Sequence, residues 1–252
     1  MARQVVFIHG MWSQPWVWER WIEGFEQAGY QCTAVTLPGH RPGEPDHALK
    51  GAGLADYVQA VETCVAMLDQ PVLVGHSLGG LLAQQVAARM KVKAAVLITS
   101  AAPAPIFPLR PAMLPGLTRH FMRWGLWRES FRLSRWEADY LLLNAIDPQR
   151  RQAYVDRLIA ESGRVAYQMG FGPLNWTGSN RVAVERIQCP LLALSGVRDR
   201  IIPIEVSRRL ARLYGSRLDY WEYPEHAHWL LEEPGYQRRI SEVLAWLDHK
   251  IG

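Results

Sequence analysis

The sequence contains few cysteines, and they form no pattern that indicates a metal site or a disulfide framework. The three cysteines among its 252 residues are an odd number, with none in a CxxC pair: Cys32, Cys64 and Cys189. We expect buried thiols in a reducing, cytoplasmic environment. The longest apolar runs are only strand-length, so no membrane span is expected. A strand pattern begins at residue 4, and we expect no cleavable signal peptide.

Lysine is also scarce, although the chain is basic. Of its 28 cationic residues only 4 are lysines, and the formal net charge is +4. The arginines are interleaved with acids and no nucleic-acid motif accompanies them, so we expect no nucleic-acid partner. Hydrophobic residues make up 49% of the chain. That share permits a large buried core and excludes a disordered or fibrous chain.

Short apolar runs alternate with helical patterns along most of the chain. The apolar runs are continuous, as in strands that are buried on both faces of a parallel sheet. They cover residues 4–8, 31–37, 71–75, 94–99, 190–195 and 217–223. The helical patterns cover residues 16–28, 54–68, 78–89, 204–214 and 236–249. This alternation predicts an α/β fold with a doubly wound, mainly parallel sheet of about six strands.

The alternation breaks once, between residues 103 and 184. This stretch is helical, with proline and glycine breaks, and it is too long for a structureless loop. We expect a helical cap insertion there, on a core made of residues 1–102 and 185–252. Its aromatic side chains favour an apolar substrate group, although most are expected in the cap's own core. Among them are Phe107, Phe121, Trp124, Trp127, Phe131, Trp136, Tyr140, Tyr154, Tyr167, Phe171 and Trp176.

The clearest functional motif is Gly75-His76-Ser77-Leu78-Gly79, followed by Gly80. It lies between a strand pattern and a helical pattern, which is the context of a nucleophile elbow. The glycines relieve crowding where the backbone is strained. The N-terminus of the following helix favours a developing negative charge. Ser77 is therefore the candidate nucleophile.

A serine nucleophile needs a base that a third group orients. Two histidines, His226 and His228, follow the last predicted strand, and parallel strands bring them to the same edge of the sheet as Ser77. We predict that His228 is the base, because the apolar residues Trp229-Leu230-Leu231 follow it and dock that end of the loop onto the core. His226 is the alternative.

The candidate orienting acid is Asp199, which follows the preceding predicted strand. Glu205 is its nearest rival, and a surface ion pair with Arg198 or Arg200 is the alternative interpretation of Asp199. The order serine, aspartate, histidine along the chain is the one expected for this elbow.

A tetrahedral oxyanion needs amide donors aimed at its charge. One is the amide of Leu78, the residue after the nucleophile. We expect the second from Met11, in the loop after the first strand, where Gly10 permits a tight turn. Trp12 and Trp229 adjoin proposed site residues and are therefore the candidate pocket residues.

These motifs together resemble the α/β-hydrolase fold superfamily over almost the whole chain. The resemblance rests on His9-Gly10, the elbow motif, Gly196-Val197-Arg198-Asp199 and His228. It implies a parallel-rich sheet, a Ser-Asp-His triad and a cap where the alternation breaks. The opening residues, through Trp16-Val17-Trp18, are also similar to the small esterase and hydroxynitrile lyase branch. Ala227 stands where the family often has a glycine before the catalytic histidine.

The expected function is that of a carboxylesterase-type serine hydrolase. It would cleave small, partly apolar ester substrates through an acyl-enzyme, with no metal and no organic cofactor. The same triad could instead serve a C–C bond hydrolase, a thioesterase, a perhydrolase or a hydroxynitrile lyase. A non-catalytic ligand receptor of the same fold is the alternative outside enzymes. A lysine near the site would favour cyanohydrin cleavage, but the sequence alone places none of the four lysines there.

Overall fold

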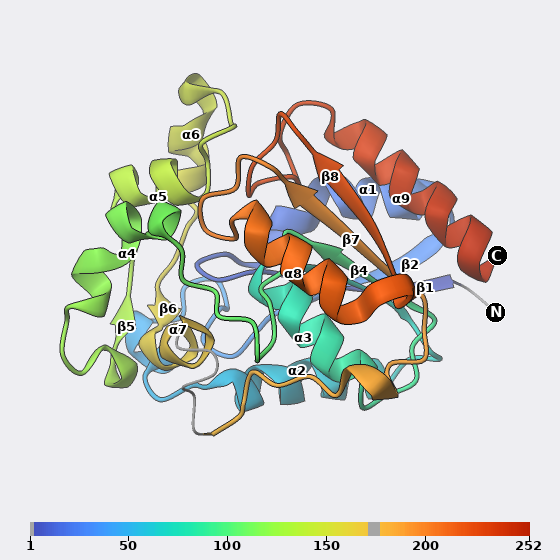
Figure 1. Ribbon diagram of the computed structural model, residues 1–252, viewed down its shortest axis with the longest axis horizontal. Helices are drawn as coiled ribbons and strands as arrows, with labels where there is room; N and C mark the ends of the chain where they lie inside the picture. The colour runs from blue at the N-terminus through green and yellow to red at the C-terminus, as the bar shows by residue number, and fades with distance from the viewer. Residues whose placement is uncertain (1–2, 171–176) are drawn as a thin grey trace.

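The computed structural model describes residues 3–170 and 177–252, and its main sheet has six strands that all run parallel. Their order across the sheet is β2-β1-β3-β4-β7-β8 (Figure 1). The strands are β1 (Arg3–Ile8), β2 (Tyr30–Val35), β3 (Val72–His76), β4 (Ala94–Ile98), β7 (Leu191–Gly196) and β8 (Leu218–Tyr223). The predicted doubly wound α/β fold is confirmed.

Burial differs between the centre and the edges of this sheet. Every residue of β3, β4 and β7 is buried, as the continuous apolar runs predict. The edge strands β2 and β8 keep partly exposed residues, because each has a neighbouring strand on only one side. For these two strands, the expectation of burial on both faces was wrong.

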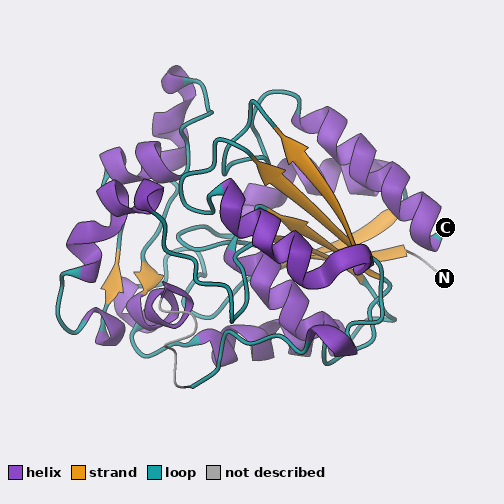
Figure 2. Cartoon of the chain, viewed as in Figure 1, coloured by secondary structure: helices purple, strands orange, loops and turns teal. Residues whose placement is uncertain are grey.

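Helices cover both faces of the sheet (Figure 2). On one face α1 (Glu19–Gln27) contacts α9 (Tyr236–Ile251). On the other, α2 (Leu54–Ala66) contacts α3 (Leu78–Ala87), and α8 (Ile204–Tyr214) packs on β7 and β8. The helix that the sequence places at residues 16–28 begins as a 3-10 turn, Pro15–Trp18, before α1. Among the described helices α9 is the longest at 16 residues, and none has the length and apolar character to cross a bilayer.

The strand order reverses at β1, which has β2 on one side and β3 on the other. Ile8, the last residue of β1, pairs with Gly75 near the end of β3. The loop after Ile8 and the turn after His76 therefore emerge side by side. In open α/β sheets, ligands bind at such a switch point, outside the carboxyl ends of the strands.

The described residues of the long segment between β4 and β7 contain four α-helices and a short ribbon. These are α4 (Leu114–Phe121), α5 (Arg135–Leu141), α6 (Pro148–Val155) and α7 (Gly163–Gly170), with β5 (Ser130–Phe131) antiparallel to β6 (Glu161–Ser162). Figure 1 shows them grouped at one side of the sheet. The ribbon was not predicted, because two residues per strand leave no periodic pattern. The cap boundaries at residues 103 and 184 stay a prediction.

The buried carboxylate of Glu161 joins the segment between β4 and β7 to residues outside that segment, on α2 and after β2. Glu161 accepts a hydrogen bond from the Tyr57 hydroxyl at 2.7 Å and lies 3.2 Å from the His40 ring. Burial alone would lower the pKa of His40, but the neighbouring Glu161 charge raises it overall. Nearby, the Ile159 amide donates to the Trp12 carbonyl at 2.9 Å. The segment is thereby fixed over the loop that follows β1.

Candidate active site

Ser77 lies at a strained turn between β3 and the N-terminus of α3. Its φ is 55°, a conformation that residues with a side chain rarely adopt. The turn is tight enough that a Cβ at Gly75 would lie 2.2 Å from the Gly79 carbonyl oxygen. A Cβ at Gly79 would lie 2.0 Å from the Ile8 carbonyl oxygen. The glycine spacing of the motif is thus required by the backbone.

Backbone hydrogen bonds hold Ser77 in this conformation. Its amide donates to the Ile98 carbonyl at 3.0 Å, and its carbonyl accepts from Gly80 at 3.0 Å and Ala101 at 2.9 Å. Surrounding structure of this kind is needed to maintain a strained residue. The turn places the Ser77 side chain at the carboxyl edge of the sheet, where it lines a cavity.

His228 and Asp199 form a buried pair at the same edge. His228 Nδ1 lies 2.7 Å from Asp199 Oδ2, and the two side chains are 2% and 1% exposed. The other carboxylate oxygen, Oδ1, accepts from the amides of Ile201 at 2.9 Å and Ile202 at 2.8 Å. Asp199 is therefore held by its own loop. Because a carboxylate accepts at Nδ1, the second ring nitrogen of His228, Nε2, is left to act as a base.

The main chain of His228 is held by the last residue of β3 and by the residue that follows β4. Its carbonyl accepts from the ring of His76 at 2.9 Å and from the Thr99 hydroxyl at 3.2 Å. Burial lowers the pKa of His76 well below its usual value, so the ring is a neutral donor. Within the described residues no hydrogen bond joins the Ser77 hydroxyl to the His228 ring. Such bonds often tighten only when substrate binds.

The rival histidine, His226, has both ring nitrogens engaged elsewhere. Its Nδ1 lies 3.0 Å from Glu233 Oε2, and its Nε2 lies 3.2 Å from Arg239 Nη1. A guanidinium only donates, so Nε2 is the acceptor and Nδ1 carries the hydrogen. The Glu233 carboxylate also accepts from the amides of Ala227 and Trp229, at 2.9 and 3.0 Å. The loop that contains His226 and His228 is therefore held by the buried Glu233 carboxylate, whose contacts the sequence did not indicate.

The alternatives considered for Asp199 are an ion pair with a neighbouring arginine and replacement of Asp199 by Glu205 as the orienting acid. Arg198 pairs with Glu225, and Arg200 lies over the Tyr140 ring at 4.4 Å, so neither forms the surface ion pair considered for Asp199. Glu205 is exposed in the first turn of α8. A Cβ at Gly196 would lie 2.1 Å from the Ala227 carbonyl oxygen. That approach explains why the strand before Asp199 ends in glycine.

The loop after β1 lies directly against Ser77. A Cβ at Gly10 would be 2.9 Å from the Ser77 Cβ. In the described part of the chain, neither the Met11 amide nor the Leu78 amide has a hydrogen-bond acceptor. Two buried N–H groups next to a serine are what an oxyanion requires.

Two side chains fix the direction of the Met11 amide. The Gly10 carbonyl accepts from His9 Nδ1 and from the Ser13 hydroxyl, both at 2.9 Å. Gly10 C=O and Met11 N–H belong to one planar trans peptide and point in opposite directions. Holding the carbonyl on one side therefore aims the amide toward the other. Burial and the neighbouring His40 lower the pKa of His9 to about 3, which keeps the ring neutral for this role.

A small apolar cavity adjoins Ser77. Its volume is about 60 Å³, and its walls come from the sheet side and from the segment between β4 and β7. Trp12 lines it together with Met11, Leu117, Phe131, Met169 and Ile202. A substrate-binding role for Trp12 stays a prediction. Trp229 is buried elsewhere, with its ring near those of Trp16, His76 and Tyr154. A pocket role for Trp229 stays a prediction, and Phe171 and Trp176 lie outside the described residues.

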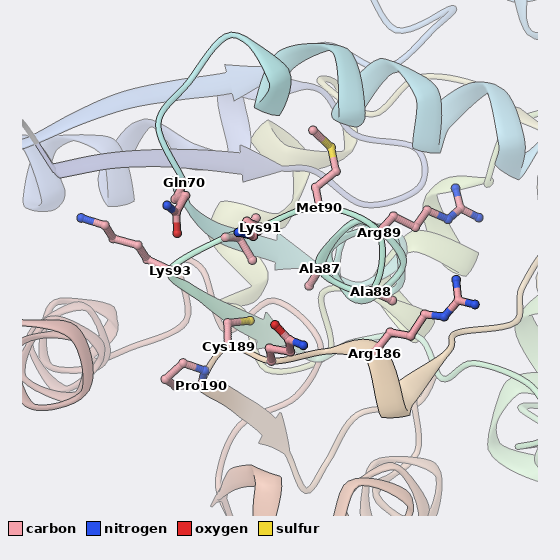
Figure 3. Close-up of a pocket in the computed structure, with 12 residues that line it drawn as sticks. Gln70, Ala87, Ala88, Arg89, Met90, Lys91, Lys93, Arg186, Cys189 and Pro190 are labelled. Carbon is pink, nitrogen blue, oxygen red and sulfur yellow. The ribbon is translucent and has the colours of Figure 1, made fainter.

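A second pocket lies at the opposite end of the sheet. Figure 3 shows it lined by residues that precede β3, β4 and β7, among them Gln70, Lys93 and Pro190. Lys93 extends on one side of this pocket, whereas Arg89 and Arg186 extend on the other, so their charges do not converge. Because this pocket lies where the strands begin and Ser77 lies where β3 ends, the two are remote from each other.

None of the four lysines lines the cavity at Ser77. Lys91 and Lys93 line the pocket at the far end of the sheet. Lys50 pairs with Glu129 at 2.7 Å, and Lys250 pairs with Asp219 at 3.0 Å. The described residues also contain no cluster of three or more metal-ligating side chains.

Comparison with known proteins gives consistent similarities. A family model described as "Alpha/beta hydrolase family" matches residues 5–237. The probable esterase PIR7A of Oryza sativa subsp. indica is 33% identical over 110 residues, a match that covers 41% of this chain and only 41% of that relative's length. The AB hydrolase superfamily protein YisY of Bacillus subtilis is 26% identical over 222 residues, which cover 84% of this chain and 80% of the length of YisY. The crystal structure of the Paleococcus ferrophilus monoacylglycerol lipase is 24% identical, with a TM-score of 0.72 over 97% of this chain and 93% of that one.

Proposed function

The chain belongs to the alpha/beta hydrolase family, and on that premise we propose that it is a carboxylesterase-type serine hydrolase acting through an acyl-enzyme. One observation carries the proposal. A buried His228–Asp199 pair, 2.7 Å apart, lies at the sheet edge where the strained Ser77 turn also ends. This arrangement supports assigning Ser77, His228 and Asp199, which come from three separate loops, as nucleophile, base and orienting acid.

The chemistry follows from the roles of these groups. Ser77 Oγ attacks the ester carbonyl carbon while its proton passes to His228 Nε2. Asp199 holds Nδ1–H and stabilises the imidazolium that forms. The C–O bond to the alcohol then breaks, and His228 returns the proton to the departing oxygen. Water attacks the acyl group with His228 again as base, which releases the carboxylic acid and restores Ser77.

The oxyanion is assigned to the amides of Met11 and Leu78. Both donors are main-chain groups that the fold fixes before the reaction, so little reorganisation is needed as charge develops. His9 and Ser13 support the first donor through the Gly10 carbonyl. No step of this sequence calls for a metal or an organic cofactor.

The cavity points to small substrates with an apolar part. At about 60 Å³ it is smaller than the pockets that hold drug-sized ligands. Long acyl chains fit only if the surrounding side chains move. The absence of a lysine from this lining also favours ester hydrolysis over the cyanohydrin cleavage considered from the sequence.

A substrate panel tests this function. We expect p-nitrophenyl acetate and butanoate to be turned over with a kcat/KM at least about tenfold above that of the decanoate, because each poorly accommodated methylene lowers transition-state binding. A butanoyl thioester and a vinylogous diketone should be slower than the matching ester. Faster C–C bond cleavage would identify that chemistry instead. A folded protein that turns over no substrate of the panel would favour the non-catalytic receptor.

A further inference from the structure

Among the described residues, one titratable side chain lines the otherwise apolar cavity next to Ser77. This is His120, on α4, so it belongs to the wall opposite the sheet side of the cavity. Its ring is buried and lies 4.7 Å from the Phe131 ring. A buried polar ring is costly unless both of its nitrogens find partners.

One ring nitrogen is engaged by the protein. His120 Nε2 lies 3.3 Å from the carboxylate of Glu137, in the first turn of α5. Glu137 also accepts from the Arg119 guanidinium at 2.6 Å and from the Ser134 amide at 2.7 Å. Burial on its own would raise the pKa of Glu137, but these hydrogen bonds lower it to about 2. The carboxylate is therefore ionised and can only accept, so Nε2 carries the hydrogen.

The other nitrogen, Nδ1, is then a hydrogen-bond acceptor. Burial lowers the pKa of His120, so the ring is neutral at neutral pH and has a single hydrogen. In the part of the chain that the structure describes, Nδ1 has no hydrogen-bond partner. A ligand that donates a hydrogen bond would satisfy it.

We propose that this cavity binds an apolar group that carries a hydrogen-bond donor such as a hydroxyl, with His120 Nδ1 as its acceptor. This deepens the proposed function and rests on it, since it names the substrate class as esters with a hydroxylated apolar part. A group of the same shape without the donor leaves this acceptor without a hydrogen bond once the cavity is filled, and it should therefore bind more weakly.

Phenol and anisole test the proposal without any need for turnover. Both are small aromatic rings with an oxygen, but only phenol donates a hydrogen bond. NMR titration of the wild-type protein at neutral pH should show phenol binding about five- to tenfold more tightly than anisole, the range expected for one hydrogen bond. Equal affinities, or no binding of phenol, would overturn the proposal.

Two variants locate the preference. His120→Phe removes the acceptor and keeps an aromatic ring, so the two affinities should become equal. Thr118→Ser, an exposed position on the same helix that does not line the cavity, should retain the wild-type ratio. A phenol preference that persists in folded His120→Phe assigns it to another group and rejects the proposal.

A second readout covers the case in which His120→Phe does not fold. In the wild-type protein, the ¹⁵N resonance of His120 Nδ1 should shift on addition of phenol and remain in place on addition of anisole. An unchanged resonance with phenol bound rejects the proposal. These results are separable from the proposed function, because a protein that binds phenol preferentially but cleaves no ester rejects only the esterase activity.

Discussion

Replacing Ser77 with alanine is expected to abolish ester turnover and leave the fold intact. Loss of the nucleophile of a triad costs on the order of 10⁴-fold or more in kcat. Alanine adopts the positive φ of this turn about as poorly as serine, and the hydrogen bonds that hold the turn come from the backbone. Stability should therefore change little. Initial rates with p-nitrophenyl butanoate and a thermal melt measure the two effects.

Ser207→Ala is the matched control for this variant. Ser207 is a buried serine on α8 that does not line the cavity at Ser77. Its loss should leave kcat within about twofold, since it takes no part in the reaction. Retention of most activity in folded Ser77→Ala would mean that another group attacks the ester.

Replacing His228 with alanine should reduce turnover by at least about a thousandfold, because base and nucleophile act as a unit. His228 is the histidine whose Nδ1 is held by Asp199, which leaves Nε2 for the Ser77 proton. His226 offers no nitrogen for that purpose, since its two are engaged by Glu233 and Arg239. His226→Ala is therefore expected to lower kcat by less than about tenfold.

The two histidine variants should differ in stability as well as in rate. His226→Ala leaves Arg239 and Glu233, both buried, without one partner each, so its melting temperature should fall. Rates are therefore compared at a temperature where both variants are folded, as judged by circular dichroism. If folded His226→Ala loses far more activity than folded His228→Ala, the base has been assigned to the wrong residue.

The parts of the fold that follow from local pattern could be predicted from the sequence. The apolar runs gave the six strands, and the glycine spacing around Ser77 gave the turn that the structure shows. Asp199 and the two histidines were placed because parallel strands end at one edge. The sequence could not separate His226 from His228 by contact, since the residues that engage His226 lie seven and thirteen positions further on.

The cavity wall was beyond sequence reasoning for a different reason. His120 and Phe131 meet only when α4 packs beside the short ribbon, and neither has a periodic pattern that predicts the contact. One readable signal was Ser134 followed three residues later by Glu137, a capping box that the structure contains. It predicts the start of α5, but not that the same carboxylate also faces a cavity histidine.

Covalent labelling of Ser77 tests the central claim most directly. A fluorophosphonate reacts with a serine that a neighbouring base activates. Intact mass and peptide mapping should show a single adduct on the peptide that contains Ser77, formed in parallel with the loss of esterase activity. The Ser77→Ala protein should remain unlabelled. An inactivated protein whose adduct lies on another residue, or an esterase that stays active and unlabelled, would contradict the account.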